Sequence, residues 1–158
     1  MPIQKVLDNA LGWVGYTEKP NNDTIFAKKA GHPNHQPWCA TFVRACFVDA
    51  GEANAIPNTA SVNEIYKWAV KNNALVTKQT AKAGDLVIMN FDGNKIPDHI
   101  GIMRQDFNMK QQMWYTIEGN TSDPANKTGS QSNGDGVYKK ERPLGYIFAI
   151  VRPKWSTK

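Results

Sequence analysis

The sequence predicts an α+β domain in which N-terminal helices pack on an antiparallel β-sheet. Apolar residues recur at helical spacing through the first half of the chain, to about residue 71. From residue 84 onward the pattern changes to short apolar runs that are rich in strand-forming residues and separated by turn signals. Helices followed by a meander of strands are typical of the α+β class. Because the chain has 158 residues and shows no internal repeat or linker, we expect residues 1–158 to form one domain.

Four helices are expected in the first half of the chain. Their apolar periodicity, proline and glycine boundaries and one capping box, Ser61 to Glu64, mark their limits. The expected helices cover residues 3–15 (ending near Gly15), 24–30 (a short helix within the polar stretch 16–36), 39–50 and 62–71.

Five strands are expected in the second half. They cover residues 84–91, 99–104, 113–118, 137–140 and 146–151. Residues 121–136 contain Ala125 as their one apolar side chain, so we expect a long loop directly after the third strand.

One cysteine stands at the predicted start of the third helix, within the run QPWCATFVRACFVD at residues 36–49. Pro33 and Pro37 disfavour helix before it, and apolar residues follow at helical spacing until Gly51. Free backbone N–H groups and the helix dipole stabilise an anion there and favour a nucleophilic thiolate. No capping residue immediately precedes Cys39, which leaves those N–H groups available to an oxyanion. A lone helical cysteine is nevertheless more often a small buried hydrophobe, so Cys39 needs partners.

The second cysteine, Cys46, lies seven positions after Cys39 on the same predicted helix. Their Cα atoms should be about 10 Å apart, which excludes a disulfide between them. Cys46 falls among apolar residues and is expected in the core.

Three polar residues on the second and third predicted strands are candidate partners of Cys39. His99 shares a strand face with Gly101, which leaves room beside the imidazole. Glu118 and Asn120 are two apart, so they point to one face at the end of their strand. This set fits a Cys/His hydrolase: the thiolate attacks a carbonyl, the histidine takes the thiol proton and returns it to the leaving amine, and a third group orients the imidazole.

Other polar residues upstream of Cys39 are weaker candidates. His32 and His35 are expected to be exposed loop histidines. Glu18, Asn22 and Asp23 could supply oxygen ligands to calcium, but they lack the dense carboxylate spacing of a loop chelate. The chain also lacks the motifs of zinc and nucleotide sites, so we expect no cofactor.

Charge and hydropathy limit the partners and location of the protein. A net charge of +5 and a pI near 9.2 favour anionic surfaces, but the basic residues are scattered, so we expect no nucleic-acid binding. A bacterial wall fits the same charge. The N-terminus has no apolar signal-peptide region and no stretch is long enough to span a bilayer, so we expect synthesis in the cytoplasm.

Four blocks of sequence, in the order in which they follow one another along the chain, resemble the CHAP family, the cysteine, histidine-dependent amidohydrolases/peptidases. The resemblance covers roughly residues 22–151. The blocks are Pro37-Trp38-Cys39-Ala40-x-Phe42-Val43, Gly84-Asp85-Leu86-Val87, His99-Ile100-Gly101-Ile102 and Ile117-Glu118-Gly119-Asn120-Thr121.

The resemblance implies a papain-like α+β fold and thiol-dependent cleavage of an amide bond in peptidoglycan. It implies Cys39 as nucleophile, His99 as base, and Glu118 and Asn120 as orienting or polarising groups. Some members bind calcium through an acidic loop before the cysteine, where this chain is poor in carboxylates.

Without a signal peptide or a wall-binding module after Val151, the chain looks like a monomeric phage endolysin made in the host cytoplasm and acting at the wall. Its positive charge would then replace a binding domain. We expect the loops at residues 16–36 and 121–136 to shape the substrate groove. Trp38, Trp114 or Tyr115 are further candidates for its lining, although aromatic residues are more often part of the core. The alternatives are a thiol amidase acting on a non-wall amide, an antibacterial effector, and a catalytically silent wall-binding protein.

Overall fold

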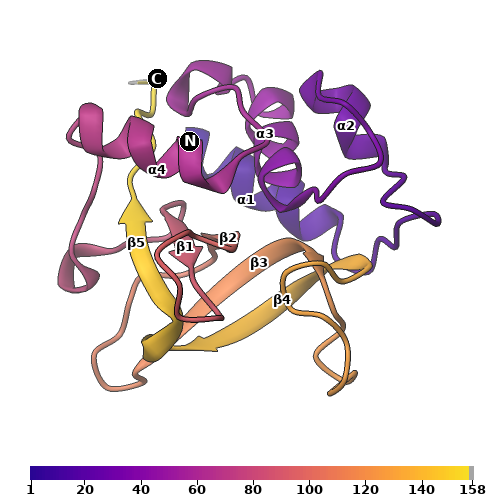
Figure 1. Ribbon diagram of the computed structural model, residues 1–158. Helices are drawn as coiled ribbons and strands as arrows, with labels where there is room; N and C mark the ends of the chain where they lie inside the picture. Colours follow the sequence, from indigo (N-terminus) through magenta and orange to yellow (C-terminus); the bar gives the residue numbers. More distant parts are fainter. Residues whose placement is uncertain (157–158) are drawn as a thin grey trace.

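The computed structural model of the protein describes residues 1–156 and contains two layers, helices above and a sheet below (Figure 1). This arrangement confirms the predicted α+β class with N-terminal helices packed on an antiparallel sheet. None of the helices in the described residues is long and apolar enough to cross a membrane. The helices are α1 (Pro2–Gly12), α2 (Ile25–Ala30), α3 (Cys39–Asp49) and α4 (Val62–Lys71), with 3-10 turns η1 (Ala53–Ala55), η2 (Lys78–Thr80) and η3 (Leu144–Tyr146).

The sheet has five strands in the order β4-β3-β2-β1-β5, and every neighbouring pair is antiparallel. All five strands fall where the sequence predicts strands, although β3 and β4 run three residues further. The strands are β1 (Leu86–Met89), β2 (His99–Met103), β3 (Met113–Thr121), β4 (Gly136–Pro143) and β5 (Ile147–Val151).

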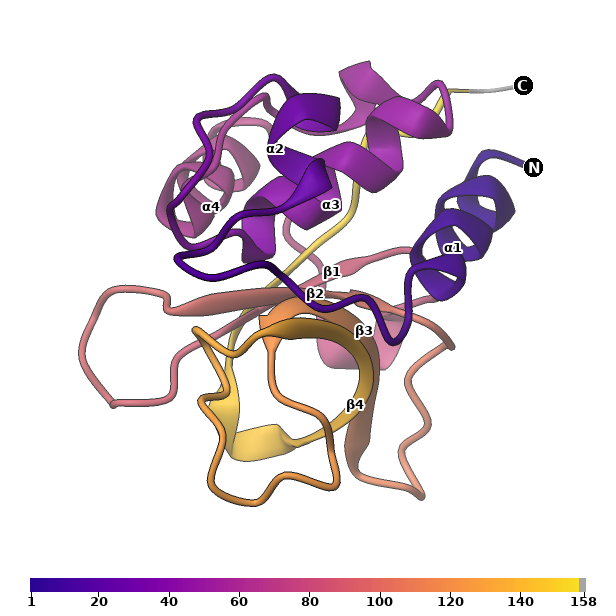
Figure 2. The ribbon, with the colours of Figure 1, turned by 90° about the vertical axis from the view of Figure 1, so that its right-hand side faces the viewer.

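The two edge strands, β4 and β5, are joined directly by the three-residue turn η3. In a flat sheet of five strands these edges would lie about 19 Å apart, whereas the four Cα–Cα steps across a three-residue turn span at most about 14 Å. The sheet must therefore curl until its edges approach each other, as Figure 2 shows. Curling encloses the face of the sheet that points away from the helices.

Alternation along the strands separates two apolar clusters. Ile100 and Ile102 of β2 belong to the main core between the sheet and the helices. Met103 belongs to a second, smaller cluster inside the curled sheet, which also contains Trp114. His99 shares this second face by alternation, as predicted.

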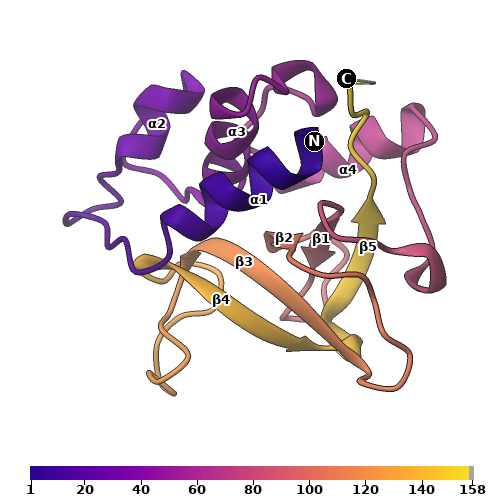
Figure 3. The same cartoon turned by 180° about the vertical axis from the view of Figure 1, so that it is seen from behind.

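The central helix of the upper layer is α3, which packs against α1 and α2 and against strands β2 and β3 (Figures 1 and 3). Eight of its eleven residues are buried, so it is apolar on nearly every side. A helix enclosed in this way holds its first residue, Cys39, in a fixed position above the sheet.

The first helix ends at Gly12, three residues before the predicted limit, because Gly15 is bonded to the sheet and does not continue the helix. Gly15 adopts a positive φ of 97° and donates its N–H to Val137 of β4. Gly15 thus turns the chain away from α1, which has already ended at Gly12, and attaches it to the sheet. By contrast, α4 begins as predicted, with Ser61 accepting the N–H of Glu64.

Candidate active site

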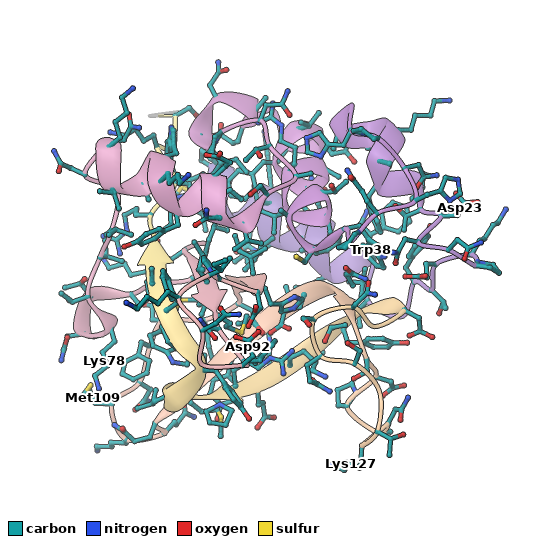
Figure 4. The ribbon with its side chains drawn as sticks, viewed as in Figure 1. Asp23, Trp38, Lys78, Asp92, Met109 and Lys127 are labelled. Carbon is teal, nitrogen blue, oxygen red and sulfur yellow. The ribbon has the colours of Figure 1, made fainter. Side chains whose placement is uncertain are left out.

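The structure brings Cys39, His99 and Glu118 together at the junction of the two layers. Cys39 opens α3 and is 5% exposed, whereas His99 and Glu118 are completely buried. Cys39 lies close enough to the imidazole of His99 to contribute to the raised pKa of that histidine. In Figure 4 the neighbouring Trp38 marks this junction, and Asp92 marks the β1–β2 loop that passes in front of the sheet.

The register of β2 and β3 explains how Glu118 reaches His99. Ile102 pairs with Ile117, which places Gly101 opposite Glu118. A Cβ atom at Gly101 would lie 2.7 Å from Cγ of Glu118. The missing side chain of Gly101 therefore makes room for the carboxylate, which crosses to His99 two residues along the same strand. The sequence predicted free space beside the imidazole at Gly101, and in the structure the side chain of Glu118 occupies that space.

Both carboxylate oxygens of Glu118 are hydrogen-bonded. Oε1 accepts hydrogen bonds from Nε2 of His99, at 2.8 Å, and from Nη2 of Arg142. Oε2 accepts hydrogen bonds from Oγ1 of Thr116, at 2.5 Å, and from Nε of Arg142, at 3.0 Å. Burial by itself raises the pKa of Glu118, but the positive charges of and hydrogen bonds from His99 and Arg142 outweigh burial and lower the pKa to about 2. Glu118 is therefore a carboxylate at neutral pH.

The two ring nitrogens of His99 have different surroundings. Nε2 bonds Glu118, whereas Nδ1 is buried and makes no hydrogen bond of ordinary geometry within residues 1–156. The interaction with Cys39 is thus left to Nδ1. Burial by itself lowers the pKa of His99, but the charge of Glu118, its hydrogen bond to Nε2 and the interaction with Cys39 outweigh burial and raise the pKa to about 9. Held in this way, His99 is an imidazolium at neutral pH, facing a thiol on one side and a carboxylate on the other.

Asn120 does not converge on the imidazole with Glu118. The β3–β4 register shifts between Glu118 and Thr121, and Asn120 adopts a positive φ of 58°, which interrupts the alternation assumed from the sequence. Its Oδ1 accepts the backbone N–H of Trp38 at 2.9 Å, and its Nδ2 donates to the carbonyl of Gly134 at 2.8 Å. Asn120 therefore ties the start of α3 to β3 and to the β3–β4 loop.

Three residues of the site were not anticipated from the sequence. Thr116 could have been found, because it lies two positions before Glu118 on the same strand face. Arg142 lies on β4 beyond the predicted end of that strand, and no local pattern signals it. The ring of Phe91, in the β1–β2 loop, lies 5.8 Å from the ring of His99 and 4.9 Å from the guanidinium of Arg142.

The upstream histidines take different positions. His35 is exposed, as expected. The expectation is wrong for His32, which is half-buried: Nδ1 bonds Oγ1 of Thr41 at 3.0 Å and Nε2 bonds Oδ1 of Asn58 at 2.8 Å. Both of its nitrogens are occupied in joining α3 to the segment before α4, so His32 has a structural role.

The oxygen atoms considered as calcium ligands bond to protein groups. The carboxylate of Glu18 accepts Nε1 of Trp38 at 2.8 Å and the N–H of Asn22 at 3.1 Å, and Oδ1 of Asp23 accepts Nδ2 of Asn34 at 2.7 Å. Within residues 1–156 no group of three or more His, Cys, Asp or Glu side chains is arranged to hold a metal ion.

The aromatic residues considered as groove lining differ in burial. Trp38 is buried and stacks on Phe26 with ring centroids 5.5 Å apart, and Trp114 is buried in the second cluster. Both therefore belong to the core, the more frequent place of aromatic residues, and do not line a groove. Tyr115 is half-buried and contacts the guanidinium of Arg104.

Comparisons with known proteins agree with this fold. A model of the CHAP domain family matches residues 31–120, more than half of the chain. The crystal structure of a wild-type endolysin, LysIME-EF1, superposes with a TM-score of 0.54 at 16% identity, covering 98% of this chain and 65% of the endolysin chain. A protein described as similar to lipoprotein, of the NLP/P60 family, from Staphylococcus aureus subsp. aureus Mu50 gives a TM-score of 0.52 at 15% identity, covering 96% of this chain and 41% of its own.

The chain thus spans less than two thirds of either solved relative. None of the curated proteins compared matches it. The likeness to the two structures is a likeness of fold, whereas the family match rests on the sequence block that contains Cys39, His99 and Glu118. The chain therefore belongs to the CHAP domain family, a family of amidase and peptidase hydrolases with a papain-like fold.

Proposed function

We propose that the protein is a cysteine-dependent peptidoglycan hydrolase of the endolysin type, which cleaves an amide bond in the bacterial cell wall. The observation that carries the proposal is the buried bond of His99 to Glu118 beside Cys39, which opens α3 and contributes to the raised pKa of His99. A helix N-terminus, an imidazolium and a carboxylate are the environment that activates a thiol for nucleophilic attack.

The proposed reaction begins with a Cys39 thiolate paired with the His99 imidazolium. The sulfur attacks the amide carbon, and the negative charge moves to the carbonyl oxygen, which the N–H groups at the start of α3 stabilise. These groups suit that role because no side chain caps α3. His99 then gives its Nδ1 proton to the leaving nitrogen, and the C–N bond breaks to leave a thioester.

Water completes the cycle. The neutral His99 takes a proton from a water molecule, whose oxygen attacks the thioester carbonyl and releases the carboxylic acid product and the Cys39 thiolate. Glu118 keeps its charge throughout, holding the Nε2 proton of His99 so that Nδ1 always faces the sulfur. Asn120 acts at a distance, by fixing the backbone that precedes Cys39.

The second thiol provides an internal contrast. Cys46 lies two turns further along α3, fully inside the main core. Burial, together with the charge of Asp49, raises the pKa of Cys46 above its ordinary value. We propose that Cys46 takes no part in the chemistry.

Charge near the site supports an anionic substrate. The β3–β4 loop, whose tip at Lys127 is marked in Figure 4, borders a cavity of about 310 Å³ that adjoins Arg142. Lys127, Lys139 and Lys140 also line it, together with one acidic residue, Glu141, so cations predominate. The carboxylates of wall peptides suit such a lining, and the net charge of +5 favours the wall as a whole.

The remaining features are proposed on the same basis. We infer a catalytic cycle without cofactor, because Cys39, His99 and Glu118 supply the nucleophile, the proton carrier and the orienting group that the reaction needs. Calcium is not required, so a chelator should leave the rate unchanged. Synthesis in a phage host's cytoplasm, action at the wall as a monomer and use in killing bacteria extend this proposal, whose named parallel is the endolysin LysIME-EF1.

The test is digestion of purified peptidoglycan from several wall types by wild type, Cys39→Ala and the matched variant Cys46→Ala. Products are analysed by mass spectrometry and by labelling new amino termini, which names the bond. We expect fragments from wild type and Cys46→Ala and none from Cys39→Ala. Equal release by all three proteins would contradict the thiol mechanism. A wild-type protein that binds walls without cutting them would favour a wall-binding protein, and one that cuts other amides would favour a different thiol amidase.

A further inference from the structure

Arg142 is a buried arginine on β4 whose guanidinium lies against the candidate triad. Its Nε donates to Oε2 of Glu118 at 3.0 Å, and its Nη2 donates to Oε1 of the same carboxylate. The guanidinium fork therefore holds both oxygens, including the one that bonds His99. Rotation of the carboxylate away from His99 would break both arginine contacts.

Other groups fix Arg142 in turn. Its Nη1 donates to Oε1 of Gln131 at 2.8 Å, and Nη2 also reaches Oγ1 of Thr121 at 3.2 Å. One face of the guanidinium lies 4.9 Å from the ring centroid of Phe91. Contacts from the β3–β4 loop, from β3 and from the β1–β2 loop thus place the arginine, which then places Glu118.

Arg142 also affects the net charge of the site. In the reactive state Cys39 and Glu118 are negative, and His99 and Arg142 are positive, so the four groups together are neutral. Removal of Arg142 would leave a net negative charge in a buried site, where screening by water is weak. Both the thiolate and neutral His99 would then be harder to form. Lys140, whose Nζ donates to the carbonyl of Ser122, is a further cation nearby. Lys140 and its charged neighbours Lys127 and Asp123 remain present in every variant below.

We propose that Arg142 is a positioning residue of the active site, which holds Glu118 in its bond to His99 and balances the charge of the site when Cys39 is a thiolate. The proposal rests on the thiol chemistry proposed above. It adds a fifth residue, contributed by the strand that pairs with the strand of Glu118, to the four implied by the family resemblance.

The test compares neutral and charged replacements with a matched arginine elsewhere. Arg142→Met and Arg142→Gln remove the charge, and Arg142→Lys keeps the charge without the fork. The control is Arg104→Met, because Arg104 is half-buried and bonds the backbone carbonyls of Thr116 and Lys140 without touching a carboxylate. For each protein, the rate of iodoacetamide alkylation at Cys39 and the kcat/KM for wall solubilisation are measured across pH.

Distinct results are expected from charge and from geometry. The neutral variants should move the alkylation midpoint and both limbs of the kcat/KM profile upward by about one pH unit. Arg142→Lys should keep the midpoint and lose roughly tenfold or more in kcat, because an ammonium cannot hold both oxygens. Arg104→Met should change neither. A lower rate with unmoved or downward-shifted limbs in the neutral variants would overturn the charge effect.

The proposal can still be decided if the neutral variants of Arg142 do not fold. If thermal unfolding shows that the neutral variants do not fold, Arg142→Lys still decides, since wild-type kcat in that variant would overturn the positioning role. Alkylation needs no substrate, so it separates this inference from the proposed function. A chain that cuts no wall but shows the shifted midpoints would retain the role of Arg142 and lose the substrate assignment.

Discussion

Nε2 of His99 lies 2.8 Å from Oε1 of Glu118, and neither side chain has any contact with solvent. This bond fixes which nitrogen of the imidazole faces the thiol, because a carboxylate accepts the Nε2 proton and leaves Nδ1 for Cys39. It also explains why a histidine with no exposed surface remains charged at neutral pH, since the carboxylate compensates for the cost of burial.

Replacement of His99 by Gln should lower kcat/KM by roughly a hundredfold to ten-thousandfold, the usual contribution of a general acid and base. The reason is that glutamine cannot carry the proton from the thiol to the leaving nitrogen. Wall solubilisation rates measure the effect. The matched control is His35→Asn, an exposed histidine whose positive φ of 64° suits asparagine. Equal losses in the two variants would contradict the assignment of His99.

Replacement of Glu118 by Gln should move the upper limb of the pH profile to lower pH. The carboxylate raises the pKa of His99 to about 9, so loss of its charge lowers that pKa and the imidazolium deprotonates earlier. We expect a shift of about one pH unit or more in kcat/KM against pH. Glu141→Gln, an exposed change on β4, should leave the limb in place. An unmoved limb in Glu118→Gln would show that His99 is not governed by this carboxylate.

The same pair predicts how stability depends on pH. Glu118 has a pKa of about 2 in the folded state against 4.5 ordinarily, so its contribution is complete above about pH 4.5 and disappears as pH falls toward 2. His99 has a raised pKa, so its contribution is complete below about pH 6.5 and disappears as pH rises through about 9. Both contributions arise from one interaction and are not additive.

Urea denaturation measures this dependence. Between about pH 6 and about pH 3 the free energy of unfolding of wild type should fall by about 2 kcal/mol more than that of Glu118→Gln. The variant is the control because its amide does not titrate, while the other carboxylates of the chain are unchanged. An identical loss in both proteins would mean that Glu118 is not held ionised by its partners.

Replacement of Gly101 by Ala should lower activity, because the added methyl group displaces the carboxylate of Glu118. The new methyl group would lie 2.7 Å from Cγ of Glu118 and 3.2 Å from Cβ of Thr116, so the carboxylate must move away from His99. We expect about 1–3 kcal/mol of destabilisation and a loss of activity larger than the destabilisation explains. Thermal unfolding and wall solubilisation are measured together. Gly145→Ala is the control, because its added methyl group meets nothing within 4 Å; wild-type activity in Gly101→Ala would contradict the packing argument.

Much of the fold was predictable because local patterns determine it. The helix that starts at Cys39, the capping box at Ser61 and the apolar strand runs are readable from spacing and from turn residues, and the structure confirms them. The end of α1 was not readable, because it depends on the bond from Gly15 to Val137, which lies 122 residues away in the sequence.

The candidate site divides in the same way. Alternation and motif order point to Cys39, His99 and Glu118, which the structure brings together, while their catalytic roles stay predictions. The position of Asn120 escaped the alternation argument, because a register shift changes the direction of its side chain. Arg142 depends on how β4 pairs with β3, and a single sequence does not reveal strand pairing.

The reactive pair of Cys39 and His99 is tested most directly by alkylation without substrate. Wild type and His99→Gln are treated with iodoacetamide across pH, and peptide mapping measures the rate at Cys39 and, as an internal control, at the buried Cys46. The account predicts that Cys39 of wild type reacts at about pH 6, far faster than Cys39 of His99→Gln, while Cys46 stays unmodified in the folded protein. If Cys39 reacts equally slowly at that pH in both proteins, and speeds up only near about pH 8.5 as an ordinary thiol does, the thiolate–imidazolium pair does not exist.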